Sequence, residues 1–186
     1  WLLVDEAHAT GLYGSSRRGM VEESGVGDHV EIQMGTLGKA IGSAGGYICG
    51  SRALIDLILN RARPFMFSTA PVPAQVAAAR AGIELVQSDE GEERCAKLWR
   101  LVDRLSDGLI RRGWKLPVVS GAILPLMVGE EKAAVALSRR LLEEGVLVPA
   151  IRYPTVARGK ARLRLTVSAA HEPADIDQLL EALGNA

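Results

Sequence analysis

Short apolar runs that end at polar or glycine-rich turns alternate along this chain with longer segments of helical period. The runs at 1–4, 32–34 and 47–49 predict buried strands. The segments 53–62 and 72–87 place their apolar residues on one stripe and predict amphipathic helices. This alternation is typical of an α/β protein.

A polar patch at 88–93 interrupts the pattern and is followed by a long periodic segment that reaches about Arg112. We place a domain boundary there, with residues 1–88 in one domain and residues 89–186 forming a linking helix and a small α/β domain. Beyond the linking helix, the pattern predicts strands at 122–128, 146–148 and 162–167, and helices at 132–143 and 173–183. Gly145 and Pro173 stand where a helix C-terminus and a first helical turn favour them.

Composition narrows the class of partner. The 22 Lys and Arg residues balance the 22 Asp and Glu residues, so the bulk charge recruits neither nucleic acid nor an anionic membrane. Two cysteines are too few for a secreted disulfide scaffold, and Cys49 in its apolar run is expected to be a buried thiol, which favours a cytoplasmic location. No cluster of residues has metal-ligand spacing. Because the chain opens on an apolar run with no Met, we expect an N-terminal portion of the protein to precede Trp1.

The segment 4–8 reads Val-Asp-Glu-Ala-His and follows a predicted strand, which places Asp5 and His8 where open α/β sheets bind ligands. The same letters are the magnesium-binding signature of DEAH-type helicases. That alternative requires a phosphate loop, and the Gly-Lys pair at Gly38 and Lys39 lacks the required first glycine and the following Ser or Thr. The nucleotide-binding interpretation is therefore disfavoured.

A second motif, at 34–46, surrounds Lys39 with small residues. Glycines let a planar cofactor approach the backbone closely, which suits a lysine that must attack a carbonyl group. Taken alone, a lysine flanked by glycines is more often a solvated residue in a turn. The two motifs are more specific together than alone, because a carboxylate at one strand end is followed about thirty residues later by Thr-x-x-Lys at another strand end.

Together these motifs resemble the α-oxoamine synthases, which depend on pyridoxal 5'-phosphate (PLP). The resemblance implies the aspartate aminotransferase fold (fold type I): the C-terminal part of the PLP-binding large domain, then a small α/β C-terminal domain. One departure is Arg17, which stands where the family usually has the first glycine of Gly-Arg-Gly. The resemblance covers nearly the whole chain and rests on the motifs at 4–11, 36–40, 67–71, 150–152 and 161–166.

The resemblance also implies roles for single residues. Lys39 carries PLP and removes the Cα proton of the amino-acid substrate, while Asp5 faces the pyridine nitrogen and keeps it protonated. His8 holds the phenolic oxygen, with a simple loop histidine as the alternative. Thr36 donates its hydroxyl to the cofactor phosphate, and Thr69 reaches a phosphate in the neighbouring subunit or, alternatively, caps a helix.

Substrates follow from the same resemblance. Arg152 grips the substrate carboxylate with its planar guanidinium, whereas Arg162 and Arg164 are expected to be surface residues. The implied reaction joins L-alanine to a pimeloyl thioester, on coenzyme A or an acyl carrier protein, in a homodimer with active sites at its interface. Family members that use glycine or serine share Asp5, His8, Lys39 and Arg152 with this chain. A reaction with either of these amino acids therefore remains an open alternative. We expect this chain alone to be inactive, and a non-catalytic homologue is disfavoured because those four residues are present.

Overall fold

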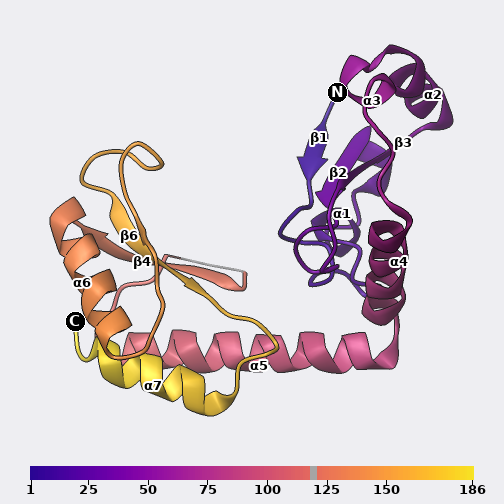
Figure 1. Ribbon diagram of the computed structural model, residues 1–186. Helices are drawn as coiled ribbons and strands as arrows, with labels where there is room; N and C mark the ends of the chain where they lie inside the picture. Colours follow the sequence, from indigo (N-terminus) through magenta and orange to yellow (C-terminus); the bar gives the residue numbers. More distant parts are fainter. Residues whose placement is uncertain (118–120) are drawn as a thin grey trace. The chain divides into compact units, whose positions relative to one another are not determined.

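The computed structural model describes residues 1–117 and 121–186, and the chain forms two compact units, residues 1–95 and 96–186 (Figure 1). The division falls inside one long helix, α5, which spans Asp89–Arg111. The boundary proposed from the sequence lies at the first residue of that helix. Each unit is described separately below.

The first unit contains a three-stranded sheet with the order β1-β2-β3. Strand β1 (Leu3–Asp5) runs parallel to β2 (Ile32–Thr36), and β2 runs antiparallel to β3 (Gly46–Gly50). Asp5 lies opposite Met34 in the register. The carboxyl ends of β1 and β2 therefore meet at one edge of the sheet, where the residues of both sequence motifs begin.

Several helical segments accompany this sheet in the chain, and one of them packs against β3. Ser51 starts α2, because its hydroxyl accepts a hydrogen bond from Leu54 N–H at 3.3 Å. A proline in the first turn starts α4, at a position where its missing N–H has no helical partner. The helical segments of the unit, besides the start of α5, are α1 (Met20–Glu23), the 3-10 helix η1 (Gly27–His29), α2 (Arg52–Arg61), α3 (Arg63–Met66) and α4 (Pro73–Gln87).

All three predicted strands are present, although β1 is Leu3–Asp5 and not 1–4, and the prediction that they are buried is wrong for β1 and β3, while β2 is half-buried. Trp1 is 89% exposed, Ile48 is 46% exposed, and the Cys49 thiol, expected to be buried, is exposed. Apolar runs become buried only where another layer packs on them. No segment among the described residues covers these side chains.

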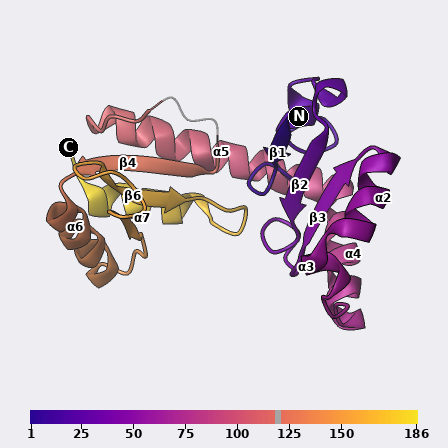
Figure 2. The same cartoon turned by 90° about the horizontal axis from the view of Figure 1, so that it is seen from above.

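The second unit is a sheet with helices packed against it. Its strands are β4 (Ile123–Gly129), β5 (Ala150–Ile151) and β6 (Ala161–Thr166), in the order β4-β6-β5 with antiparallel pairing. Helix α6 (Glu131–Glu143) contacts β4 and β6 (Figure 2). Helix α7 (Pro173–Leu183) lies beside α5.

Apolar and polar residues alternate along the strand β6, and the apolar ones form part of this core, as the sequence predicts. Along β6, Leu163 and Leu165 are buried while Arg164 between them is exposed. The predicted stripe of α5 is buried as well, and Leu105 and Leu109 are among its fully buried side chains. The ends of α6 and α7 also agree with the sequence: Gly145 follows α6 with a left-handed φ of +80°, and Pro173 opens α7.

The strand predicted at 146–148 is wrong. This segment forms no strand, and pairing with β6 begins at Pro149, whose carbonyl accepts from Arg164 N–H at 3.0 Å. The strand itself is Ala150–Ile151. A run of valine and leucine fits an extended backbone, but the neighbouring strand decides which residues pair.

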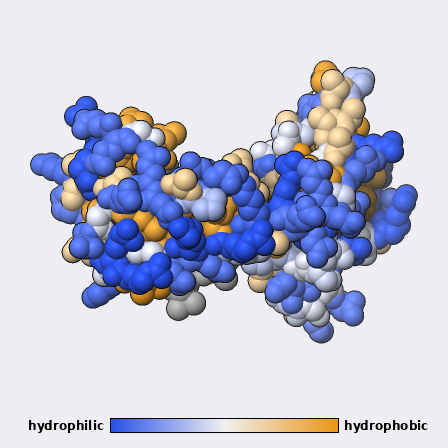
Figure 3. Space-filling model, turned by 90° about the horizontal axis from the view of Figure 1, so that it is seen from below, coloured by the Kyte–Doolittle hydropathy of each residue, from blue (hydrophilic) through white to orange (hydrophobic). Residues whose placement is uncertain are grey.

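The surface is mixed in character. On the face in Figure 3, hydrophilic residues dominate, and apolar side chains gather in small areas on both units. None of the helices in the described ranges is long and apolar enough to cross a bilayer.

Candidate active site

Asp5 and His8 lie on the turn that leaves β1. Asp5 is the last residue of the strand, and its exposed carboxylate accepts a hydrogen bond from Ala7 N–H at 2.8 Å. The Glu6 carbonyl closes the turn by accepting from Ala9 N–H and from Thr10 N–H, each at 2.9 Å. His8 is therefore presented from a compact turn whose first residue follows Asp5.

Lys39 lies on the loop between β2 and β3. Two hydrogen bonds close this loop, from Leu37 N–H to Gly45 O at 2.9 Å and from Ser43 N–H to Leu37 O at 2.8 Å. The exposed Lys39 side chain reaches the first motif, and its Nζ lies 3.2 Å from His8 Nε2. The fold thus brings together the lysine and the histidine of motifs that are 31 residues apart.

Thr36, the last residue of β2, is engaged within its own loop. Its hydroxyl donates to Gly45 O at 3.1 Å and accepts from Gly38 N–H at 3.1 Å. The hydroxyl has one proton, so it would have to turn away from Gly45 to donate to a phosphate. Thr36 is within the same loop as Lys39, as the sequence predicts, but its role toward a cofactor stays a prediction.

Thr69 lies in the exposed loop between α3 and α4. The N-cap of α4 is Val72, and no side chain caps that helix, so Thr69 does not take the alternative role of capping it. Its role toward a phosphate in a neighbouring subunit stays a prediction.

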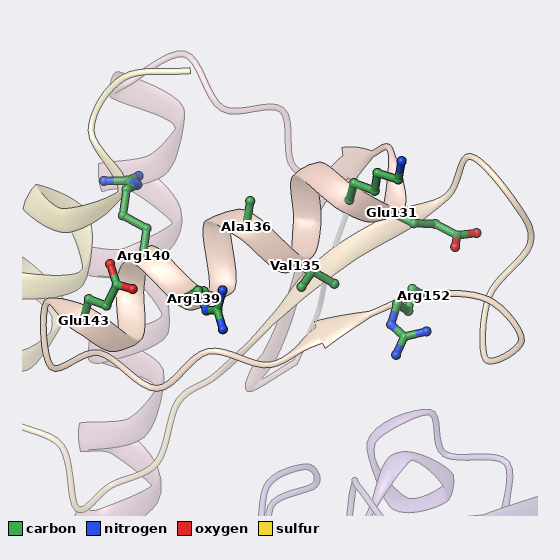
Figure 4. A pocket seen from close by; sticks show the side chains of 8 residues that line it. Glu131, Val135, Ala136, Arg139, Arg140, Glu143 and Arg152 are labelled. Carbon is green, nitrogen blue, oxygen red and sulfur yellow. The ribbon is translucent and has the colours of Figure 1, made fainter.

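Arg152 belongs to the second unit and directly follows the edge strand β5. With residues of α6 it lines a pocket of about 510 Å³. In Figure 4, Arg139 and Arg152 extend in the same direction with Val135 between them. Arg152 is exposed and belongs to no ion pair among the described residues, so its guanidinium is available to a carboxylate. The expected surface residue Arg164 is exposed, and Arg162 donates to Lys160 O at 3.1 Å.

Two contacts next to the site were not foreseen from the sequence. The Thr10 and Tyr47 hydroxyls are 2.7 Å apart and join the turn after β1 to β3. The Tyr47 ring passes over Gly35, where an added Cβ would lie 2.4 Å from the phenol oxygen. Glycine at position 35 is therefore required by the tyrosine, and no spacing rule in the sequence connects these residues.

The third unforeseen feature is the buried carboxylate of Glu6, which is 2% exposed. Its oxygens accept hydrogen bonds from Met20 N–H and Val21 N–H, each at 2.8 Å. In the sequence, Glu6 looks like the second half of an acidic pair with Asp5. The strand's alternation is the available signal, because consecutive residues point to opposite sides of a strand end.

Arg17 stands at the departure from the family's glycine pattern, and it adopts the left-handed conformation with a φ of +58°. Its guanidinium donates to Val86 O at 2.8 Å and to Ser88 O at 3.3 Å, at the C-terminal end of α4. Nearby, the Arg18 N–H donates to the Glu22 carboxylate and holds the pKa of that carboxyl below its usual range. The loop after β1 is thus fixed by backbone-to-carboxylate hydrogen bonds.

The donor set at this edge of the sheet suits PLP. The cofactor presents a ring nitrogen, a phenolic oxygen, an aldehyde and a phosphate, and the site offers a carboxylate, an imidazole, an amine and a hydroxyl. Asp5, His8, Lys39 and Thr36 supply these groups from two adjacent strand ends. By contrast, no group of three or more His, Cys, Asp or Glu residues in the described parts of the chain could hold a metal ion.

Comparison with known proteins decides the family. The model of the family described as "Aminotransferase class I and II" matches residues 1–183. The chain belongs to this family. A member named 8-amino-7-oxononanoate synthase, from Anaeromyxobacter dehalogenans (strain 2CP-C), is 47% identical over 182 residues, covering 98% of this chain and 45% of that protein. The chain therefore spans less than half the length of this curated relative.

Solved structures show the same fold as this chain. A serine palmitoyltransferase from S. paucimobilis, with bound PLP, has a TM-score of 0.91 at 28% identity, covering 97% of this chain and 46% of that one. An 8-amino-7-oxononanoate synthase from Francisella tularensis has a TM-score of 0.84 at 24% identity, covering 98% of this chain and 53% of that one. The second likeness shows the fold alone. The fold predicted from the sequence, that of the PLP-dependent fold type I enzymes, is confirmed.

Proposed function

We propose that the protein containing this chain is an 8-amino-7-oxononanoate synthase. It condenses L-alanine with a pimeloyl thioester, on coenzyme A or an acyl carrier protein, and yields 8-amino-7-oxononanoate, carbon dioxide and the free thiol in biotin biosynthesis. The observation that carries the proposal is the meeting of Lys39 Nζ and His8 Nε2, 3.2 Å apart, beside Asp5 at the strand ends. The 47% identity to a relative of that name supports the choice of reaction.

The proposed cofactor is PLP, which supplies an electron sink for the negative charge that develops at the amino-acid Cα. Asp5 is an acceptor whose negative charge favours a proton on the ring nitrogen, and this charge strengthens the sink. His8 lies next to Lys39 and orients the phenolic oxygen. Lys39 anchors the cofactor and carries the Cα proton, while Arg152 binds the substrate carboxylate through two parallel charge-assisted hydrogen bonds.

Phosphate binding and assembly belong to the same proposal. Thr36 holds the cofactor phosphate once its hydroxyl turns from Gly45, and Thr69 reaches the phosphate of a partner subunit. The active form is then a homodimer with its sites at the interface, working on small molecules in the cytoplasm. The exposed loop that holds Thr69 supports this assignment, since the hydroxyl is free to meet a partner.

A second candidate uses serine in place of L-alanine. It is favoured by the TM-score of 0.91 to the serine palmitoyltransferase from S. paucimobilis. That protein is 28% identical, whereas the alanine-type relative is 47% identical over nearly the same span, so we prefer L-alanine. A glycine-using relative, such as 2-amino-3-ketobutyrate coenzyme A ligase or 5-aminolevulinate synthase, is the remaining alternative. Assays of the three amino acids with one acyl thioester discriminate among these reactions.

Borohydride reduction tests the cofactor assignment. A full-length protein that contains this sequence is incubated with PLP, reduced and digested, and the modified peptide is mapped by mass spectrometry. We expect a phosphopyridoxyl group on Lys39, because its amine is exposed beside His8. The matched control is Lys39→Ala, which should carry no stoichiometric label. A folded native protein with no adduct on Lys39 would overturn the proposal.

A further inference from the structure

The buried carboxylate next to the proposed cofactor site takes no part in the chemistry described above. Among the polar and charged side chains that the structure describes, Glu6 alone is classed as buried. A buried carboxylate is strongly unfavourable unless hydrogen bonds replace its water. Both oxygens are satisfied here by backbone N–H groups, those of Met20 and Val21 at 2.8 Å. We therefore ask which part of the backbone these hydrogen bonds hold in place.

The backbone lies so close to the Glu6 carboxylate that position 19 has no space for a side chain. Gly19 is buried and has a φ of +139°, and a Cβ at this position would lie 2.5 Å from Glu6 Oε2 and 2.6 Å from Cδ. The backbone of residues 19–21 therefore wraps closely around the carboxylate. The Glu6 side chain thus ties the end of the loop after β1 to the residue that follows the strand.

The backbone of the same residue controls the turn that presents the site. Glu6 N–H donates to Met34 O at 2.7 Å, which continues the β1–β2 ladder by one residue. Its carbonyl accepts from Ala9 N–H and Thr10 N–H, and also from the Thr10 hydroxyl at 3.1 Å. Asp5 precedes Glu6, and His8 lies within the turn that the Glu6 carbonyl closes. Rotation of Glu6 would therefore move both residues.

We infer that Glu6 is a positioning residue of this site. Its side chain clamps Met20 and Val21, and the clamp fixes the direction in which Asp5 and His8 leave the strand. Glu6 itself touches no reacting atom. The inference rests on the proposed function, because it assigns Glu6 a role toward the groups that would hold the cofactor.

The first test is Glu6→Gln in the full-length protein that contains this sequence. The amide keeps one accepting oxygen but turns an NH2 group toward the second backbone N–H. We expect a changed imidazole 1H–13C chemical shift for His8 in the cofactor-free protein, with His29 and His171 unchanged. With PLP bound, we expect kcat to fall at least tenfold and KM for the amino acid to change less than twofold. The matched control is Glu23→Gln, which removes an exposed charge that accepts from Gly14 N–H in the same loop.

The second test leaves Glu6 intact and disturbs its carboxylate from the other side. In Gly19→Ala the new methyl group meets the carboxylate, so the His8 signal should shift as it does in Glu6→Gln. The control is Gly25→Ala, another glycine at positive φ (+64°) with nothing within 4 Å of the added Cβ. It imposes backbone strain without touching Glu6, and its His8 signal should stay native.

Either variant decides the question if the other does not fold. A native His8 signal in a folded Glu6→Gln or Gly19→Ala protein would show that Glu6 merely stabilises the loop, and the inference would fall. An equal shift in Gly25→Ala would have the same meaning. Because the His8 signal is read without cofactor, this outcome is separate from the labelling of Lys39, which tests the proposed function.

Discussion

Arg17 combines an unfavourable backbone with favourable side-chain contacts. A non-glycine residue in the left-handed region is strained by about 1–2 kcal/mol, and Arg17 has a φ of +58°. Its guanidinium donates to two carbonyls at the end of α4, Val86 O and Ser88 O. A net contribution of about 0.5–1.5 kcal/mol is typical of one such hydrogen bond, so the bonds offset the strain.

Two substitutions at this position separate the effects. Arg17→Ala keeps the left-handed strain and loses both hydrogen bonds, so it should lower the free energy of unfolding by about 2 kcal/mol. Arg17→Gly loses the same bonds but relieves the strain, so it should be about 1 kcal/mol more stable than Arg17→Ala. Urea unfolding measures both. Equal stabilities of the two variants would contradict the role assigned to the backbone.

At the residue scale, the sequence indicates which side chains are candidates for the chemistry, but it does not indicate the contacts that hold them in place. Asp5, His8, Lys39 and Thr36 are candidates from their motifs and from the family resemblance, and the fold places them at two adjacent strand ends, while their roles toward a cofactor stay predictions. The carboxylate of Glu6 and the ring of Tyr47 could not be identified, since their partners lie 14 to 37 residues away and follow no period. Such contacts depend on how a loop closes in three dimensions.

At the scale of elements, the contact between α5 and α7 is fastened by a pair of charges. Arg104 donates to both carboxylate oxygens of Asp177, at 2.8 and 2.7 Å. These hydrogen bonds hold the pKa of Asp177 below its ordinary range and raise the pKa of Arg104. The pair is exposed to solvent, so its effect on stability should be small.

The pH dependence of the pair has a definite sign. The pKa of Asp177 is lower in the folded protein than in the unfolded chain, where it is about 4. The stabilisation is therefore fully present above about pH 4 and is lost as the pH falls through the folded-state pKa. We expect Asp177→Asn to flatten the acid dependence of unfolding in this range, measured by thermal unfolding from pH 2 to pH 7. Glu181→Gln, on the same helix, is the control, and an equal flattening there would refute the assignment.

Elements with strong internal patterns were predictable. The stripe of α5 and the alternation of β6 are set by the side chains of one segment, and the structure buries the same faces. The strand at Ala150–Ile151 was misplaced because it is two residues long and is defined by its pairing with β6. The short segments α1, η1 and α3 have too few turns to show a period.

At the scale of the whole molecule, exposed apolar side chains occur in a chain whose formal net charge is zero at pH 7. Phe65 and Phe67 are both exposed, Phe67 by 74%, and the Arg63 guanidinium lies 5.6 Å from the Phe67 ring centroid. A molecule without net charge has little long-range repulsion to oppose association through such side chains. The exposed strands of the first unit add to this tendency.

We therefore expect the 186-residue chain to associate as its concentration rises at pH 7. Sedimentation velocity should show a weight-average mass that increases with concentration. Replacing Phe65 and Phe67 with serine should lower this increase, since the exposed aromatic surface is removed. The control is Leu147→Ser, which removes a single side chain that is 79% exposed in the second unit. If both variants associate equally, the aromatic residues are not responsible.

The contact between Glu6 and Gly19 has a consequence for how such sequences diverge. A side chain at position 19 would overlap the carboxylate at position 6, so position 19 is not free to change while Glu6 is kept. A lineage that first shortens residue 6 would release the constraint at position 19, and the reverse order would pass through a poorly folding intermediate. Across descendants of this protein, a residue other than glycine at position 19 should therefore occur only where residue 6 has already changed.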